Sequence, residues 1–119
     1  MSKPIRAGRA YLPKQGDIVL VNFDPQSGHE PKVMHPALVV SKEQFNRATS
    51  LVIVCPILLH EKGFPLHVSL DSRTKTTGVI LCDHVKSIDP IARGIKFIER
   101  CPDDIWAEAV DIVIGAIEI

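Results

Sequence analysis

Two stretches of the sequence hold side chains that could transfer protons near neutral pH. The first is a polar loop between two predicted strands, longer than the usual hairpin connection, and its candidate residues are His29, Glu30, Lys32 and His35. The second is Asp83 with its neighbour His84, at the end of a later predicted strand. An imidazole titrates near neutrality, and a carboxyl group does so where its surroundings raise its pKa. Both stretches are therefore candidates for general acid and base chemistry, although surface loops often hold such residues without a role.

The sequence lacks the motifs that point to a metal or a bound cofactor. The five histidines share no ligand spacing, and Cys55, Cys82 and Cys101 form no C-x-x-C pair. There is no Walker A lysine motif, no dinucleotide-binding glycine pattern and no G-x-S-x-G elbow. We therefore predict no metal and no cofactor, and we interpret the cysteines as small buried apolar residues.

The formal net charge is zero, with fourteen Lys and Arg and fourteen Asp and Glu, which argues against a protein that coats duplex DNA by bulk positive charge. The charges are unevenly placed, because residues 101–119 hold five acids and neither Lys nor Arg. The preceding hundred residues therefore carry a charge of plus five. Such a basic body attracts a polyanion, either RNA phosphates or an acidic peptide, and the alternative is an ordinary solvated surface.

The 119 residues, of which 45% are hydrophobic, suffice for one compact domain. Pro4, Gly8 and Pro13 predict a flexible arm over residues 1–13, before a single domain over residues 14–119. No apolar run approaches the ~20 residues of a membrane helix, and the N-terminus lacks the apolar segment of a secretory signal. We therefore expect a cytoplasmic protein that does not contact a membrane.

Short apolar runs separated by turn signals predict a mainly β fold, either a barrel or a sandwich. The predicted strands cover residues 16–23, 36–40, 51–59, 67–70, 78–82, 85–88 and 95–98. Ser41 is a predicted N-cap for a short helical turn, and Asp103 or Asp104 is a predicted N-cap for a C-terminal helix. The apolar positions of that helix, from Ile105 to Ile117, recur at helical spacing.

Many short motifs, in one order along the chain, resemble the MazF/PemK/Kid toxins of bacterial toxin-antitoxin modules, and the Kid and PemK branch most closely. The resemblance covers residues 14–119, and its clearest motifs are Gly16-Asp17-Ile18-Val19-Leu20-Val21, Phe23-Asp24-Pro25, Ser27-Gly28-His29-Glu30, Pro36-Ala37-Leu38-Val39-Val40-Ser41, Thr76-Thr77-Gly78-Val79, Cys82-Asp83 and Ala92-Arg93-Gly94. It implies a small SH3-like barrel of the CcdB/MazF type with a C-terminal helix. It also implies a homodimer, and an acidic cognate antitoxin through which any contact with DNA would pass.

The implied activity is that of a metal-independent, sequence-specific endoribonuclease, an mRNA interferase that cleaves single-stranded RNA. In this chemistry the ribose 2′-OH attacks the neighbouring phosphorus and leaves a cyclic phosphate, which is why DNA would be spared. The resemblance assigns catalysis to His29, Glu30 and Asp83, and we predict that His35 takes part where the family has an arginine. The predicted RNA-binding residues are Lys32, Arg73, Lys75, Thr77, Lys86 and Arg93.

Two further positions depart from the family pattern, because Leu58 and Leu81 stand where the family has a threonine and an arginine. A catalytically impaired relative that binds RNA or antitoxin without cleaving is therefore the alternative function. A gyrase poison like the CcdB toxins is a third hypothesis and the least favoured, because the chain ends in Ala116-Ile117-Glu118-Ile119 and has no tryptophan there.

Overall fold

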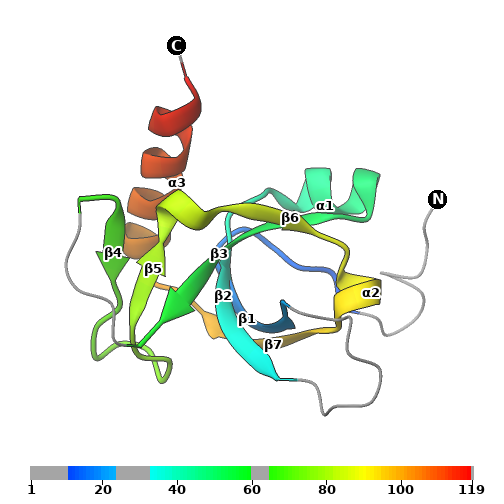
Figure 1. The fold of residues 1–119 in the computed structure, drawn as a ribbon, viewed down its shortest axis with the longest axis horizontal. Helices are drawn as coiled ribbons and strands as arrows, with labels where there is room; N and C mark the ends of the chain where they lie inside the picture. Colours follow the sequence, from blue (N-terminus) through cyan, green and yellow to red (C-terminus); the bar gives the residue numbers. More distant parts are fainter. Residues whose placement is uncertain (1–10, 24–32, 60–64, 119) are drawn as a thin grey trace.

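A computed structural model describes residues 11–23, 33–59 and 65–118 (Figure 1). The elements in chain order are β1 (Asp17–Asn22), β2 (Met34–Val39), α1 (Glu43–Thr49), β3 (Val52–Leu58), β4 (His67–Ser69), β5 (Val79–Leu81), the 3-10 turn η1 (Cys82–His84), β6 (Lys86–Ile88), α2 (Pro90–Arg93), β7 (Ile95–Arg100) and α3 (Asp103–Ile117). All seven predicted strands are present, and the mainly β architecture with a C-terminal helix is confirmed. The short helix α2 was not predicted.

The strands form one antiparallel sheet in the order β4-β5-β3-β2-β1-β7, with β6 paired to β3. Strand β3 serves two partners, because its first half pairs with β6 and its last two residues pair with β5. The sheet curls on itself as the prediction of a small barrel requires (Figure 1). Among the described strands, however, no ladder closes the curl between β6 and β7.

Helix α2 accounts for this opening, because it lies between β6 and β7 where a hairpin would otherwise join them (Figure 1). The Asp89 side chain caps the helix by accepting a hydrogen bond from the Ile91 N–H at 2.9 Å. Pro90 occupies the first helical turn, where its missing N–H costs nothing. These residues favour a helical turn over a tight strand connection, so the two strands stay apart.

The central strands are apolar on both faces because each face covers a separate core. Ile18, Leu38 and Cys55 belong to the core that α3 covers. Their neighbours in sequence belong to a second core on the opposite face, inside the curl, whose members are Val19, Val21, Ala37, Val39, Val52, Val54 and Ile88. Alternate residues of a strand face opposite sides, so this arrangement explains the unbroken apolar runs.

Helix α3 packs on the first core through Ile105, Ala109 and Val113, at the four-residue spacing of one helix face. Burial of each of the two larger side chains stabilises the fold by about 1.5–3 kcal/mol. Ile117, the last residue of the helix, is exposed. The prediction of the N-cap was wrong, because Pro102 is the N-cap residue and gives no side-chain bond.

The two acids predicted to cap α3 have other partners. Asp103 accepts a hydrogen bond from the Trp106 indole at 3.0 Å, and Asp104 pairs with Arg73. Ser41 likewise does not cap α1, whose N-cap residue is Lys42. The Ser41 hydroxyl instead donates to Asn46 Oδ1 at 2.5 Å and accepts from the Ile53 N–H at 2.9 Å.

The start of the described chain is packed against the sheet. Pro13 is buried, and its carbonyl accepts a hydrogen bond from Asn46 Nδ2 at 2.9 Å. Tyr11 donates a hydrogen bond to Asp17. The last three residues of the expected arm are therefore fixed to the domain, and residues 1–10 lie outside the described structure. None of the helices in the described segments has the length and apolar character needed to cross a bilayer.

Candidate active site

His35 lies at the start of β2 with its side chain exposed, and it faces Val21 across the β1–β2 ladder. Its ring lies beside that of Phe23, with 6.5 Å between the ring centroids and 38° between the ring planes. The imidazole is therefore at the surface and not in the core, so it is available to an incoming ligand. An imidazole can donate or accept a proton and, when protonated, can pair with a phosphate.

Phe23 also joins two of the predicted cations. The Lys86 ammonium lies 5.1 Å from the centroid of the Phe23 ring, which is cation–π geometry. The Arg93 guanidinium donates a hydrogen bond to the Phe23 carbonyl. We call these residues, Phe23, His35, Lys86 and Arg93, the Phe23 cluster. Since the Phe23 ring packs on the second core, it forms a fixed support for the three polar side chains.

The Phe23 cluster brings together side chains that are widely separated in the sequence, from the end of β1, the start of β2, the start of β6 and the end of α2. Two cations and an imidazole beside a surface aromatic ring suit a phosphate group and an adjacent base. Sequence analysis named three of the four residues, and it missed Phe23 as their common support. An aromatic residue just after a strand, before an expected loop, was the available signal.

Asp83 lies in the turn η1, and the structure gives it a partner that the sequence did not suggest. Its Oδ1 is 3.0 Å from Nε2 of His67 on β4, and its Oδ2 is 3.8 Å from Nε2 of His84. The His67 side chain is 8% exposed and that of Asp83 is 30% exposed. His67 lies directly opposite Leu81 in the β4–β5 ladder, two residues before Asp83. Only this strand register, which sequence spacing does not reveal, places the two together.

Cys55 and Cys82 lie beside Asp83, and Cys101 belongs to the same core as they do. The hydrogen bond between Cys55 and Cys82, together with burial, raises the pKa of the Cys55 thiol, so this thiol stays protonated. Burial raises the pKa of Cys101 to about 11. All three cysteines are free and buried, which confirms their interpretation as small buried apolar residues.

The chain links the Phe23 cluster to Asp83 directly. Lys86 follows Asp83 by three residues, so their Cα atoms are at most about 11 Å apart, even for an extended chain. A ligand with several charged groups could span His35, Lys86 and Asp83 together.

The two leucines that depart from the family pattern lie at strand ends. Leu58, at the end of β3, is exposed, and Leu81, at the end of β5, is buried.

The other predicted RNA-binding residues lie on the connection between β4 and β5 or outside the described chain. The Arg73 guanidinium is engaged by two carboxylates, at 2.8 Å from Asp71 and 2.9 Å from Asp104. The Lys75 N–H donates to Glu99 at 3.0 Å, and Thr77 is exposed. The structure does not bring these three residues into the Phe23 cluster. The remaining candidates outside the described residues are His29, Glu30 and Lys32.

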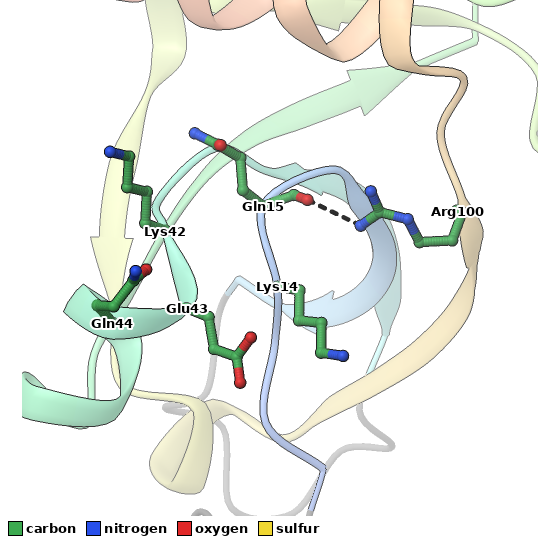
Figure 2. A pocket seen from close by; sticks show the side chains of 6 residues that line it. All are labelled: Lys14, Gln15, Lys42, Glu43, Gln44 and Arg100. Atoms are coloured by element: carbon green, nitrogen blue, oxygen red, sulfur yellow. Dashed lines mark hydrogen bonds between the residues drawn. The ribbon is translucent and has the colours of Figure 1, made fainter.

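A second polar region lies where the start of the domain meets α1 and β7. Figure 2 shows a hollow of about 520 Å³ lined by Lys14, Gln15, Lys42, Glu43, Gln44 and Arg100. The Arg100 guanidinium is held by the Gln15 carbonyl at 2.7 Å and by Asp17 at 3.0 Å. Three cations, against Glu43 in the lining and Asp17 on Arg100, leave this hollow positive. Within the part of the chain that the structure describes, no three His, Cys, Asp or Glu side chains gather as metal ligands.

The fold and the sequence both match one family of proteins. The curled sheet with its C-terminal helix superposes on MazF in a MazE–MazF complex from Deinococcus radiodurans with a TM-score of 0.81 and 35% identity, over 92% of this chain and 98% of that chain. The chain is also 41% identical to the endoribonuclease PemK of Escherichia coli, over 82% of this chain and 76% of PemK. It is 39% identical to the endoribonuclease toxin MazF of Escherichia coli K12, over 71% of this chain and 75% of MazF.

A family model described as a PemK-like, MazF-like toxin of type II toxin-antitoxin systems matches residues 14–114. This chain therefore belongs to the PemK-like and MazF-like toxin family, as its motifs predicted.

Proposed function

We propose that this toxin is an endoribonuclease that cleaves single-stranded RNA without a metal ion, acting in the cytoplasm. The observation that carries the proposal is the exposed His35 ring beside Phe23, with Lys86 and Arg93 held by the same residue. The contacts of a proton-transferring group and two cations with one residue support a phosphate site at the Phe23 cluster. Lys86 and Arg93 supply positive charge beside the same ring as His35, which stands where the family has an arginine.

The reaction has three chemical requirements, and the chain offers groups for each. The 2′-OH must lose a proton, the leaving 5′-oxygen must gain one, and the crowded phosphorane needs stabilisation of its charge. His35 and Asp83 are the proton-transferring groups, with His29 and Glu30 assigned by the family resemblance. Lys86 and Arg93 stabilise the phosphorane, while Lys32, Lys75, Thr77 and Arg73 bind the flanking nucleotides.

The test is digestion of a long RNA by the purified protein in EDTA. We expect site-specific cuts that leave cyclic phosphate ends, and a loss of about 10²–10⁴-fold in rate for His35→Ala, because one proton-transferring group contributes about that much. Lys96→Ala, at an exposed residue on β7, is the control for loss of a surface side chain.

Intact RNA that comigrates with the wild-type protein would overturn the cleavage proposal. It would favour the catalytically impaired RNA-binding alternative. Inhibition of DNA supercoiling without any RNA cleavage would instead support the gyrase poison.

An acidic antitoxin is the proposed protein partner. Three features support it: the excess of positive charge before residue 101, the positive hollow of Figure 2, and the MazE–MazF complexes of the related Deinococcus radiodurans protein. Opposite charges on the two proteins would speed their association and strengthen it at low salt.

The homodimer is also a proposal, and an apolar trough supports it. The trough has a volume of about 350 Å³ and lies between α3 and β6, with Val110, Ile114 and Ile117 on its helical side. Ile117 is 72% exposed in the single chain. An apolar surface of this kind marks a protein contact.

Ile117→Glu should convert the dimer to a monomer of 13.1 kDa by light scattering, because it places a charge in the apolar contact. Ile91→Glu is the matched control, since Ile91 is a 58% exposed isoleucine on α2, outside the trough. A wild-type protein that is monomeric at micromolar concentration would contradict the proposal.

A further inference from the structure

We infer that His67 is a positioning residue for Asp83: its Nε2–H holds one carboxylate oxygen, so that the other oxygen is presented to the RNA. This inference rests on the proposed function, because it takes Asp83 to be a proton-transferring group. The resemblance and the sequence motifs assign nothing to His67. The structure alone places it 3.0 Å from the carboxylate.

The direction of the hydrogen bond follows from the chemistry of the two groups. An ionised carboxylate has no proton to give, so the His67 Nε2–H must donate to Asp83 Oδ1. The bond therefore fixes both the imidazole tautomer and the rotation of the carboxylate. The second oxygen, Oδ2, stays on the exposed side, where its neighbour is His84 at 3.8 Å.

Burial distinguishes the roles of the two residues. His67 is nearly inaccessible, so RNA cannot contact it, while the Asp83 side chain remains partly open to solvent. Any effect of His67 on the reaction must therefore pass through Asp83. Proton transfer requires the oxygen within about 2.6–3.2 Å of its partner, so the orientation of the carboxylate matters directly.

The backbone under this pair is fixed on both sides. Strand β4 pairs with β5 through Val68 opposite Ile80, and both side chains are buried. The Cys82 N–H donates to the Leu66 carbonyl at 3.2 Å, which ties the residue before His67 to the turn that carries Asp83. The contact is thus built into the sheet, unlike a pair of flexible side chains on a surface.

Few other charged or titratable groups of the described chain lie around this pair. His84 belongs to the same turn as Asp83, and Cys82 and Cys55 are buried next to it on η1 and β3. From α3, which packs against β4 and η1, the charge of Glu108 reaches Cys82. His67 is accordingly the group that contacts Asp83 Oδ1, and exposed His84 is the group nearest to Oδ2.

Two substitutions separate the hydrogen bond from the bulk of the side chain. His67→Leu removes the donor and keeps an apolar body of similar size, whereas His67→Gln keeps an N–H at a similar reach. We expect His67→Leu to lower kcat on a defined RNA oligonucleotide by roughly 10- to 100-fold with little change in KM, because a displacement of about 1 Å costs about that much. His67→Gln should recover most of the loss.

Lys96→Ala, at an exposed residue on β7 away from the pair, is the control and should change kcat by less than about three-fold. Equal kcat for wild type and His67→Leu would overturn the inference. The inference would also be overturned if His67→Gln unfolded at the wild-type temperature and yet had a kcat as low as that of His67→Leu.

A measurement without RNA distinguishes a failure of this inference from a failure of the proposed function. Nitrogen NMR of the histidine rings should show a proton on Nε2 of His67 in the wild type, and a changed Nε2 signal in Asp83→Ala. If the RNA stays intact but this signature is present, the proposed nuclease fails and the bond stands. If Nε2 carries no proton, the inference is overturned whether or not the RNA is cleaved.

Discussion

Two aspartates, Asp17 and Asp83, each accept hydrogen bonds from a basic side chain, and the remaining surroundings give them different roles. Asp17 opens β1, and its side chain is 3% exposed. Its Oδ1 accepts from Arg100 at 3.0 Å, while Oδ2 accepts from Lys14 N at 3.0 Å and from the Tyr11 hydroxyl. Among the described residues, Asp83 has a hydrogen bond at 3.0 Å on Oδ1 alone, and its side chain is partly exposed. A carboxylate with both oxygens occupied anchors the fold, whereas one with an open oxygen can do chemistry.

The elements around the two residues agree with this division. Burial and the hydrogen bond to Asp17 raise the pKa of Tyr11, so the phenol stays protonated and remains a donor. Gly16 next to Asp17 has a φ of +96°, and a Cβ there would lie 2.8 Å from both Arg100 and Trp106. Asp17 thus ties the start of the domain to β7, while Asp83 joins η1 to β4.

The largest expected effect is on activity at Asp83. Asp83→Asn keeps the shape of the side chain but removes its capacity to accept and return a proton, so we expect RNA cleavage to fall by about 10²–10⁴-fold. Thermal unfolding should change little, because Asp83 is a partly exposed residue in a short turn. Cleavage rates and melting curves on the same preparation measure both. Wild-type cleavage by Asp83→Asn would remove Asp83 from the mechanism.

The next largest effect is expected at Asp17, where a substitution should lower the stability of the fold and leave the cleavage rate unchanged. Asp17→Asn leaves the Arg100 cation without its buried partner, which should cost about 3 kcal/mol of unfolding free energy, the low end for buried pairs, because Arg100 is half exposed. Urea unfolding measures the loss. The specific cleavage rate of the fraction that stays folded at low temperature should match that of the wild type. A variant as stable as the wild type would end the distinction between the two aspartates.

The sequence predicted the strands well because β-branched runs bounded by turn residues define them locally. It failed where a short polar side chain had a choice of partners. Ser41 and Asp103 are good caps in isolation, but in the fold they bond Asn46 and Trp106 instead. His67 was missed for a related reason, since its contact with Asp83 depends on the β4–β5 register and on no local pattern.

The candidate site was predictable to a similar extent. His35, Lys86 and Arg93 were named as separate residues, from their chemical types and from the family resemblance. Their gathering around Phe23 depends on the curl of the sheet, which brings the end of β1 close to β6 and α2. Spacing along the chain contains no information on that curl.

The smallest expected effect is on stability, at the exposed carboxylates of Asp71 and Asp104, which both pair with Arg73. These two residues extend the comparison to a third kind of carboxylate. Hydrogen bonds from Arg73 hold the pKa of Asp71 and the pKa of Asp104 below their usual value of 3.8. A carboxyl group whose pKa is lower in the folded state stabilises the fold at any pH above its unfolded-state pKa. This stabilisation is lost as the pH falls through the folded-state pKa. Arg73→Ala should therefore lower the melting temperature slightly at pH 7, and the difference from wild type should shrink as the pH falls below 3.8.

Salt should shrink the same difference, because exposed charges are screened. Lys96→Ala removes an equal charge from an exposed position on β7 and should show no such pH dependence. A melting difference for Arg73→Ala that persisted at pH 2 would mean that the arginine acts through packing of its side chain and not through the two carboxylates. In that case burial would not explain why Asp71 and Asp104 contribute less to stability than Asp17. The ordering of the three kinds of carboxylate by burial would then be wrong for the exposed pair.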